Sequence, residues 1–197
     1  MTFKLGLTGS IGMGKTTTAN LFKNAGCDVW SADSAVERLY QIGGKAVLPI
    51  KEVFPKSIVA GKVSKKKLRQ ILEKNPSYFS KLENIVHPLV AEDRQYFIKT
   101  SVSVLSVLEI PLLFETGGEK NMDAVACVKI DYETQKARVL KRGLMTLKQF
   151  EQIVSRQLSI EEKCARADYI ITTENIEVTK KQIAKILADI EGKEIDA

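Results

Sequence analysis

The eight residues Gly9–Thr16, with the sequence GSIGMGKT, constrain this chain more than any other feature. They fit G-x-x-x-x-G-K-[ST], the pattern of a phosphate-binding loop. The segment Phe3–Thr8 predicts a buried strand before the loop, and Thr17–Asn24 predicts a helix after it. Glycines leave backbone N–H groups open to phosphate oxygens, and the helix start adds partial positive charge. The alternative, an ordinary glycine-rich turn, is disfavoured by this strand and helix. The sequence therefore predicts nucleotide binding.

Two side chains of the loop have predictable roles. Lys15 would reach the β- and γ-phosphates, and the Thr16 hydroxyl would bind Mg²⁺, which is the predicted cofactor. The nucleotide-binding positions that we predict in and beside the loop are Gly9, Gly12, Met13, Gly14, Lys15, Thr16 and Thr17.

Composition limits the class of protein. The 197 residues suffice for one α/β domain with an insertion, or for two small lobes that share a core. The longest nearly apolar run, Val102–Phe114, contains two serines, a glutamate and a proline, so it is too short and too polar to span a bilayer. The N-terminus enters the first strand directly, so no signal peptide is expected. We therefore predict a cytoplasmic protein with no membrane partner.

Charge and cysteine content narrow the class further. The net charge of +6 suggests a polyanionic partner, which a nucleotide already supplies. Basic clusters at residues 62–69 and 136–142 are not interleaved with aromatic residues, so no nucleic-acid partner is predicted. Cys27, Cys127 and Cys164 are odd in number and widely spaced, which predicts reduced thiols rather than a disulfide or zinc framework.

Apolar runs alternate with helical patterns along the chain, which is typical of a parallel sheet with crossover helices. The fold class that we predict is α/β with a five-stranded parallel sheet. The stretch 34–99 looks mainly helical and is too long for a simple crossover, so it predicts a helical insertion over the carboxyl edge of the sheet. Within it, Asn75 followed by Pro76 predicts a helix start. The predicted strands are residues 3–8, 27–30, 104–109, 124–130 and 168–172.

Capping patterns mark further helices in the second half of the chain. Thr146 with Gln149, and Ser159 with Glu162, fit the capping box. The segment Tyr132–Arg166 therefore predicts two or three basic helices between the fourth and fifth strands. In a phosphotransferase this is the place for a lid.

Two carboxylates are candidates for chemistry. Asp33 lies just past the second strand, at the sheet edge that also carries the phosphate loop. It could accept a proton from an attacking hydroxyl or hold Mg²⁺ through water; the alternative is that it caps a helix from Ser34 to Gln41. Glu109 ends the third strand, where a second Mg²⁺ contact is usually found. For Glu109 the alternative is simply an acidic residue at a strand exit.

His87 is the only histidine, so any histidine base must be this residue. It precedes Pro88, and a residue before proline is pushed away from helical geometry. A functional and a structural role are both open for it.

Arg138 and Arg142 are four residues apart on a predicted helix over 133–142, so they share a face. Guanidinium groups match phosphate oxygens, which makes both arginines candidates for contacts to a transferred phosphoryl group. The alternative is a solvated basic face. Arg156 and Lys163 are weaker candidates. The apolar stripe opposite would consist of Ala137, Leu140 and Leu144.

Together these residues resemble the dephospho-coenzyme A kinase family over nearly the whole chain. The segment Pro111-Leu112-Leu113-Phe114-Glu115 is the most specific match after the phosphate loop. Other segments that resemble the family's motifs, in order, are Ala32-Asp33, Leu82 to Val90 with His87-Pro88, Glu133 to Arg142, Arg156-Gln157, Glu162-Lys163 and Ala167 to Ile171.

The resemblance implies ATP-dependent phosphorylation of the ribose 3′-hydroxyl of dephospho-coenzyme A, with Mg²⁺. It implies a nucleotide-binding core (1–33 and 100–197), a helical acceptor domain (34–99) and a lid (about 115–166). ATP and dephospho-coenzyme A are the implied partners of a monomer or weak homo-oligomer. The implied catalytic residues are Asp33 as the base, Lys15 as the phosphate lysine and Arg142 as the lid arginine. The implied acceptor contacts are Asp33, His87 and Glu115.

The sequence departs from the family pattern without losing this catalytic set. The departures are Ser31, Ser64-Lys65, Glu109, Thr173 and Asn175. A shikimate or nucleoside monophosphate kinase would share the loop but would not require the segments around His87 and Glu115. A GTPase should carry an Asn-Lys-x-Asp motif, and the sequence has none. A nucleic-acid ATPase should carry a second sensor motif, which is not recognised in the sequence.

Overall fold

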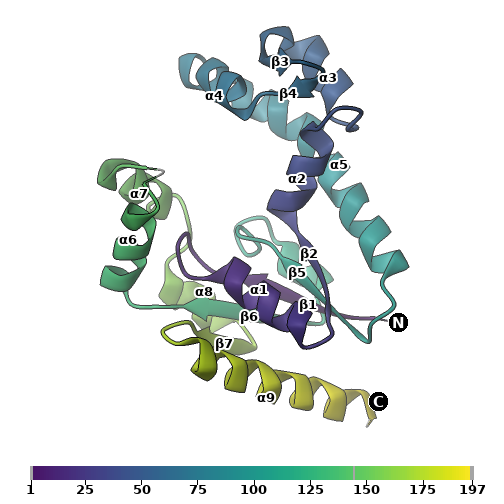
Figure 1. Cartoon of the computed structure of the whole chain (residues 1–197), viewed down its shortest axis with the longest axis vertical. Coiled ribbons are helices and arrows are strands. Elements are labelled where there is room, and N and C mark those ends of the chain that lie inside the picture. Colours follow the sequence, from purple (N-terminus) through teal and green to yellow (C-terminus); the bar gives the residue numbers. More distant parts are fainter. Residues whose placement is uncertain (1, 144, 196–197) are drawn as a thin grey trace. The chain divides into compact units, whose positions relative to one another are not determined.

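The computed structural model describes residues 2–143 and 145–195, and the chain divides into two compact units (Figure 1). The core unit consists of Met1–Val29 and Val102–Ala197, and the insertion unit is Trp30–Ser101. Each unit has its own cluster of buried apolar side chains. The two are therefore described one at a time.

A five-stranded parallel sheet forms the centre of the fold, with strand order β2-β5-β1-β6-β7. These strands are β1 (Phe3–Thr8), β2 (Asp28–Ser31), β5 (Leu105–Glu109), β6 (Ala124–Lys129) and β7 (Tyr169–Thr172). Each differs from its predicted bounds by one residue at most, and the predicted fold class is confirmed. The prediction succeeds because a parallel sheet is covered on both faces, so its strands are nearly continuous apolar runs.

Helices and a long loop cover the two faces of the sheet in the core unit. Alternate residues of β6 enter different clusters: Ala126 packs with Phe22 of α1 (Lys15–Asn24) and Ile186 of α9 (Ile176–Ile195), whereas Val125 packs with Leu113. This alternation follows from the two-residue period of a strand. The remaining helices of the core unit are η2 (Gly118–Asn121), α6 (Tyr132–Lys141), α7 (Leu147–Val154) and α8 (Ile160–Arg166).

The predicted helix starts of the second half lie where the capping patterns place them. The Thr146 hydroxyl oxygen accepts a hydrogen bond from the N–H of Gln149, and the Thr146 N–H donates to Gln149 Oε1, so this capping box is confirmed. Ser159 likewise accepts from the N–H of Glu162. Asp131 caps α6 by accepting from the N–H of Thr134, a cap that was not predicted.

The insertion unit is mainly helical, as predicted, but it also contains a hairpin. Strands β3 (Ile58–Val59) and β4 (Lys62–Val63) pair in antiparallel fashion across a two-residue turn. Ala60 and Gly61 in this turn have φ of 47° and 76°, as a tight hairpin requires. The helices of this unit are α2 (Ala32–Tyr40), α3 (Val47–Val53), η1 (Pro55–Ser57), α4 (Lys65–Lys74) and α5 (Tyr78–Thr100).

Two predictions around prolines of the insertion unit are wrong. Asn75 is the C-cap of α4, and α5 begins only at Tyr78, so Asn75-Pro76 does not start a helix. Pro88 lies inside α5, so His87 is helical. The local preference against helix before proline is outweighed because Val86, on the same turn, is buried in the core of the unit.

Two further observations concern the class of protein. Cys27, Cys127 and Cys164 are free thiols. Among the described residues, no helix is both long and apolar enough to cross a membrane.

Candidate active site

The phosphate loop joins β1 to α1, and residues of α6 and β6 pack against it. Gly12 has φ of 77°, and a Cβ placed on it would lie 2.4 Å from Val139 Cγ2 and 3.3 Å from the Gln135 backbone oxygen. Gly9 is crowded in the same way by the Val128 carbonyl, at 2.6 Å. These glycines thus permit both the turn of the loop and the close approach of α6 and β6. Met13 in the same loop is buried in the core cluster.

Lys15 folds back over the loop. Its Nζ donates hydrogen bonds to the carbonyl oxygens of Gly9, at 2.7 Å, and Ser10, at 3.0 Å. These bonds place the ammonium above the loop whose N–H groups are suited to phosphate oxygens. The predicted phosphate lysine is therefore in position to meet an anion.

Thr16 and Glu109, the two predicted Mg²⁺ contacts, lie together. The Thr16 hydroxyl donates to Glu109 Oε1 at 2.9 Å, and Glu109 is only 5% exposed. The register of the sheet explains the contact, because β1 and β5 pair with Leu7 opposite Glu109. A hydroxyl and a carboxylate suit Mg²⁺, which takes few protein ligands and completes its shell with waters and phosphate oxygens. No cluster of three or more acidic, cysteine or histidine residues that could hold a metal occurs among the described residues.

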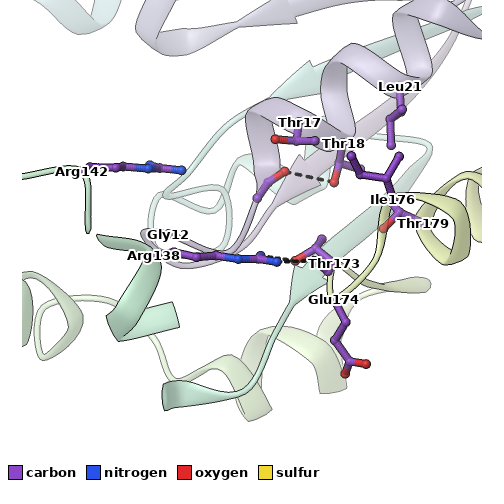
Figure 2. Close-up of a pocket in the computed structure, with 11 residues that line it drawn as sticks. Gly12, Thr17, Thr18, Leu21, Arg138, Arg142, Thr173, Glu174, Ile176 and Thr179 are labelled. Carbon is purple, nitrogen blue, oxygen red and sulfur yellow. Dashed lines mark hydrogen bonds between the residues drawn. The ribbon is translucent and has the colours of Figure 1, made fainter. Parts of the chain in front are cut away.

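A pocket of about 230 Å³ opens beside the loop (Figure 2). Arg138 crosses one side of it and donates from Nη1 to Thr173 Oγ1, at 3.2 Å, and from Nη2 to the Thr173 carbonyl, at 2.7 Å. Thr173 Oγ1 in turn donates to the Met13 carbonyl at 2.7 Å, so α6, the loop and the segment after β7 are linked. The pocket is lined by Gly12, Gly14, Thr17, Thr18, Leu21, Arg138, Arg142, Thr173, Glu174, Ile176 and Thr179.

Arg142 lines the same pocket and points in the same direction as Arg138 in Figure 2. Its side chain is exposed, and it makes no hydrogen bond or ion pair with the part of the chain that the structure describes. The two arginines share a face, as predicted. The guanidinium of Arg142 is therefore available to a ligand, whereas that of Arg138 is partly engaged by Thr173.

The predicted apolar stripe of α6 is wrong at Ala137, which is exposed, whereas Leu140 is half-buried. The buried residues of the helix are Gln135 and Val139, which pack against the phosphate loop. The side of α6 that faces the protein is therefore partly polar, which the apolar periodicity cannot reveal. Leu144 lies outside the described residues.

Glu115 and Lys163 form a buried ion pair. Lys163 Nζ, which is fully buried, lies 2.8 Å from Glu115 Oε1 and donates to the Pro111 carbonyl at 3.1 Å. The Leu158 N–H also donates to Glu115 Oε1, at 3.0 Å. This pair joins the loop after β5 to α8 and holds Lys163 away from solvent, so Lys163 is not placed as a surface phosphate contact. Arg156, the other weaker candidate, is exposed.

Two predicted residues belong to the insertion unit. Asp33 is exposed and lies in the first turn of α2, whose N-cap is Ser31, so the alternative that Asp33 caps this helix is wrong. His87 is exposed on α5. Neither side chain hydrogen-bonds or ion-pairs with any residue that the structure describes.

Sequence reasoning assigned no role to three residues that contact the loop. Gln135 donates from Nε2 to the Ile11 carbonyl at 2.7 Å, and the Ile11 N–H donates to Gln157 Oε1 at 3.2 Å. Thr173 contacts the loop through Met13, as described above. Gln135 and Gln157 stand inside segments that resemble family motifs, which is the only sequence signal for them.

The chain is similar to known proteins over its whole length. A family model described as dephospho-CoA kinase matches residues 3–196. A dephospho-CoA kinase of Ruegeria pomeroyi is 52% identical over 197 residues, which cover 100% of both chains. One from Cereibacter sphaeroides is 45% identical over 188 residues, 95% of each chain.

Solved structures extend the similarity to the fold. A dephospho-CoA kinase from Campylobacter jejuni superposes with a TM-score of 0.69 at 26% identity, covering 98% of this chain and 100% of the other. The protein TT1252 from Thermus thermophilus gives a TM-score of 0.84 at 28% identity, covering 95% and 97%. A shikimate kinase from Acinetobacter baumannii, at 18% identity and a TM-score of 0.53, shares the fold alone; it covers 98% and 95%.

Proposed function

This chain belongs to the dephospho-CoA kinase family, and from that premise we propose which of its residues transfer a phosphoryl group from ATP to the ribose 3′-hydroxyl of dephospho-CoA. The observation that carries the assignment is the phosphate loop with Lys15 above it and the Thr16–Glu109 pair beside it. A loop, a cation and a metal-binding pair are the parts that phosphoryl transfer requires of a protein.

On the nucleotide side, the loop N–H groups of Gly12, Gly14 and Lys15 hold the phosphates, with Met13 and Gly9 shaping the loop. Thr16 and Glu109 would hold Mg²⁺, which would neutralise phosphate charge. Thr17 and Arg138 border the pocket beside the loop, where the rest of the nucleotide lies.

The chemical step needs a base and a cation. The Asp33 carboxylate accepts the proton of the ribose 3′-hydroxyl, and the oxygen attacks the γ-phosphorus of ATP as the bond to the β-phosphate oxygen breaks. Negative charge on the transferred group is met by Lys15 and by Arg142, whose guanidinium has no protein partner among the described residues. ADP then leaves, and Asp33 returns its proton to solvent.

The acceptor side is assigned to the insertion unit, with lid function for the helices α6, α7 and α8. His87 on α5 contacts the coenzyme, and Glu115 positions the acceptor through the buried pair that fixes its loop. We further propose that the enzyme acts in the cytoplasm as a monomer or weak homo-oligomer and takes no nucleic acid.

A matched set of acceptors tests this function. Purified protein with ATP and Mg²⁺ should add a single phosphate to dephospho-CoA, detected by mass spectrometry, and none to its 3′-deoxy analogue. Shikimate, a nucleoside monophosphate and single-stranded DNA serve as the competing acceptors, and GTP as the competing donor. Phosphorylation of the 3′-deoxy analogue, or preferential use of another acceptor, would refute the proposal.

A further inference from the structure

Ile11, in the outer turn of the phosphate loop, has both of its backbone polar groups bound by side-chain amides. Its carbonyl accepts from Gln135 Nε2 at 2.7 Å, and its N–H donates to Gln157 Oε1 at 3.2 Å. Gln135 belongs to α6, and Gln157 lies between α7 and α8. Two separate segments of the lid region therefore hold the two peptide groups on either side of the Ile11 Cα.

The orientation of both amides is determined by their backbone partners. A carbonyl oxygen can only accept, so Gln135 must present its NH₂ group; a backbone N–H can only donate, so Gln157 must present its oxygen. Each contact therefore has a fixed direction. A glutamate carboxylate accepts hydrogen bonds but cannot donate them. Gln135→Glu therefore removes the bond to the Ile11 carbonyl, whereas Gln157→Glu keeps the bond from the Ile11 N–H.

The surroundings make the contact at Gln135 costly to lose. Gln135 is only 2% exposed, and its backbone oxygen and Val139 on the next turn press against Gly12. A buried polar group left without a partner costs more than the bond itself contributes. The same helix carries Arg138 and Arg142, so the bond to Ile11 also fixes where these arginines stand relative to the loop.

We propose that Gln135 and Gln157 are positioning residues for ATP: they hold the outer turn of the phosphate loop against the lid region in the geometry that binds the nucleotide. This inference rests on the proposed function, because the loop must bind ATP. Donors that are already aligned bind phosphate without a reorganisation cost, so loosening the backbone at Ile11 weakens nucleotide binding.

Two matched substitutions test the direction of the bonds. Gln135→Glu and Gln157→Glu each add one negative charge beside Ile11, but only Gln135→Glu loses its hydrogen bond. We expect the ATP Kd, measured by calorimetry without acceptor, to rise about tenfold more in Gln135→Glu than in Gln157→Glu. Gln152→Glu, an exposed change on α7, controls for added charge in the lid region.

Steady-state kinetics separate positioning from a merely structural role. The KM for ATP should rise with the Kd in Gln135→Glu, whereas the KM for dephospho-CoA should stay within about threefold of the parent value. A structural role alone would lower the melting temperature and the active fraction without this split. Equal ATP affinities in the two glutamate variants would overturn the inference.

A second pair of variants applies if Gln135→Glu does not fold. Gln135→Met and Gln157→Met keep side-chain volume, add no charge and remove one bond each, so both should weaken ATP binding by several-fold. Unchanged ATP affinity in both would also overturn the inference. Failure of the parent protein itself to bind ATP would instead refute the proposed function.

Discussion

In the core unit, Lys15, Thr16 and Arg138 around the phosphate loop are bonded to protein groups. In the insertion unit, Asp33 and His87 are exposed and bond to no residue in the described part of the chain. Lys15 binds loop carbonyls, and Thr16 binds Glu109. The fold therefore positions the side chains that we propose for the nucleotide. Asp33 and His87, which we propose for the acceptor, are not fixed by such bonds.

Several charged side chains of the insertion unit bind other residues of the same unit. Asp93 on α5 accepts from Trp30 Nε1 at 2.7 Å and pairs with Arg38 of α2. Lys45 pairs with Glu92 in the same way, so these contacts tie the start of the unit to its last helix. Asp33, in contrast, forms no such contact with any residue that the structure describes.

The largest expected effect tests the acceptor side. Asp33→Asn should lower kcat by about 10²- to 10⁴-fold, because asparagine cannot take a proton from the ribose hydroxyl. The free energy of unfolding should stay within about 1 kcal/mol of the parent, since Asp33 is exposed and is not the N-cap of α2. Kinetics and thermal melts check this, with exposed Glu52→Gln as the matched control. Retained activity would move the search for the base to Glu109.

On the nucleotide side, Lys15→Ala should lower kcat/KM for ATP by about 10²- to 10³-fold. The substitution removes the positive charge of the ammonium that we propose to face the transferred phosphoryl group. The fold should survive, since the Lys15 ammonium contacts loop carbonyls rather than the core. Lys23→Ala, at the exposed end of α1, removes the same charge away from the loop and should be neutral. Near-normal turnover by folded Lys15→Ala protein would contradict the phosphate-loop assignment.

Replacing Arg142 tests whether the proposed lid contributes a cation to phosphoryl transfer. Arg142→Ala should lower kcat by about 10²-fold while ATP affinity changes less, if the guanidinium meets charge that develops during transfer. Arg138→Ala should also weaken ATP binding, because Arg138 is bonded to Thr173 beside the loop. Lys141→Ala, an exposed neighbour, is the control. An unchanged kcat in Arg142→Ala would return Arg142 to a solvated basic face.

The smallest effect on catalysis is expected at the Glu115–Lys163 pair, where the change appears in stability. Burial alone would raise the pKa of Glu115, but the hydrogen bond from Lys163, backbone N–H groups and the ammonium charge together hold it below its ordinary value of 4.5. The pair's contribution is therefore fully present above the unfolded-state pKa and is lost as the pH falls through the lower folded-state pKa.

Lys163→Met should accordingly lower the free energy of unfolding by about 3–5 kcal/mol at neutral pH, because it leaves a buried carboxylate unpaired. The difference from the parent should shrink as the pH falls and Glu115 becomes protonated in the variant. Urea unfolding at several pH values measures this, with exposed Lys148→Met as the control. A difference that does not depend on pH would show that lost packing, not charge, is responsible.

The sequence predicts the sheet and the loop residues well because their signals are local. Buried parallel strands are apolar runs, and the loop motif itself contains Lys15 and Thr16 at fixed positions. Pro88 was misread because its local preference is overridden by the packing of Val86. Gln135 and Gln157 bind Ile11 across separations of 124 and 146 residues, so no local sequence pattern predicts these contacts.

The pairing of β5 with β1 has a consequence for how this chain can vary. Leu7 stands opposite Glu109, and successive side chains of a strand point to opposite faces. Deleting one residue inside β5 would turn Glu109 away from Thr16 while leaving every remaining residue identical. Val107 can therefore change to another apolar residue, but an insertion or deletion of one residue in this strand would separate Glu109 from Thr16 in a single step.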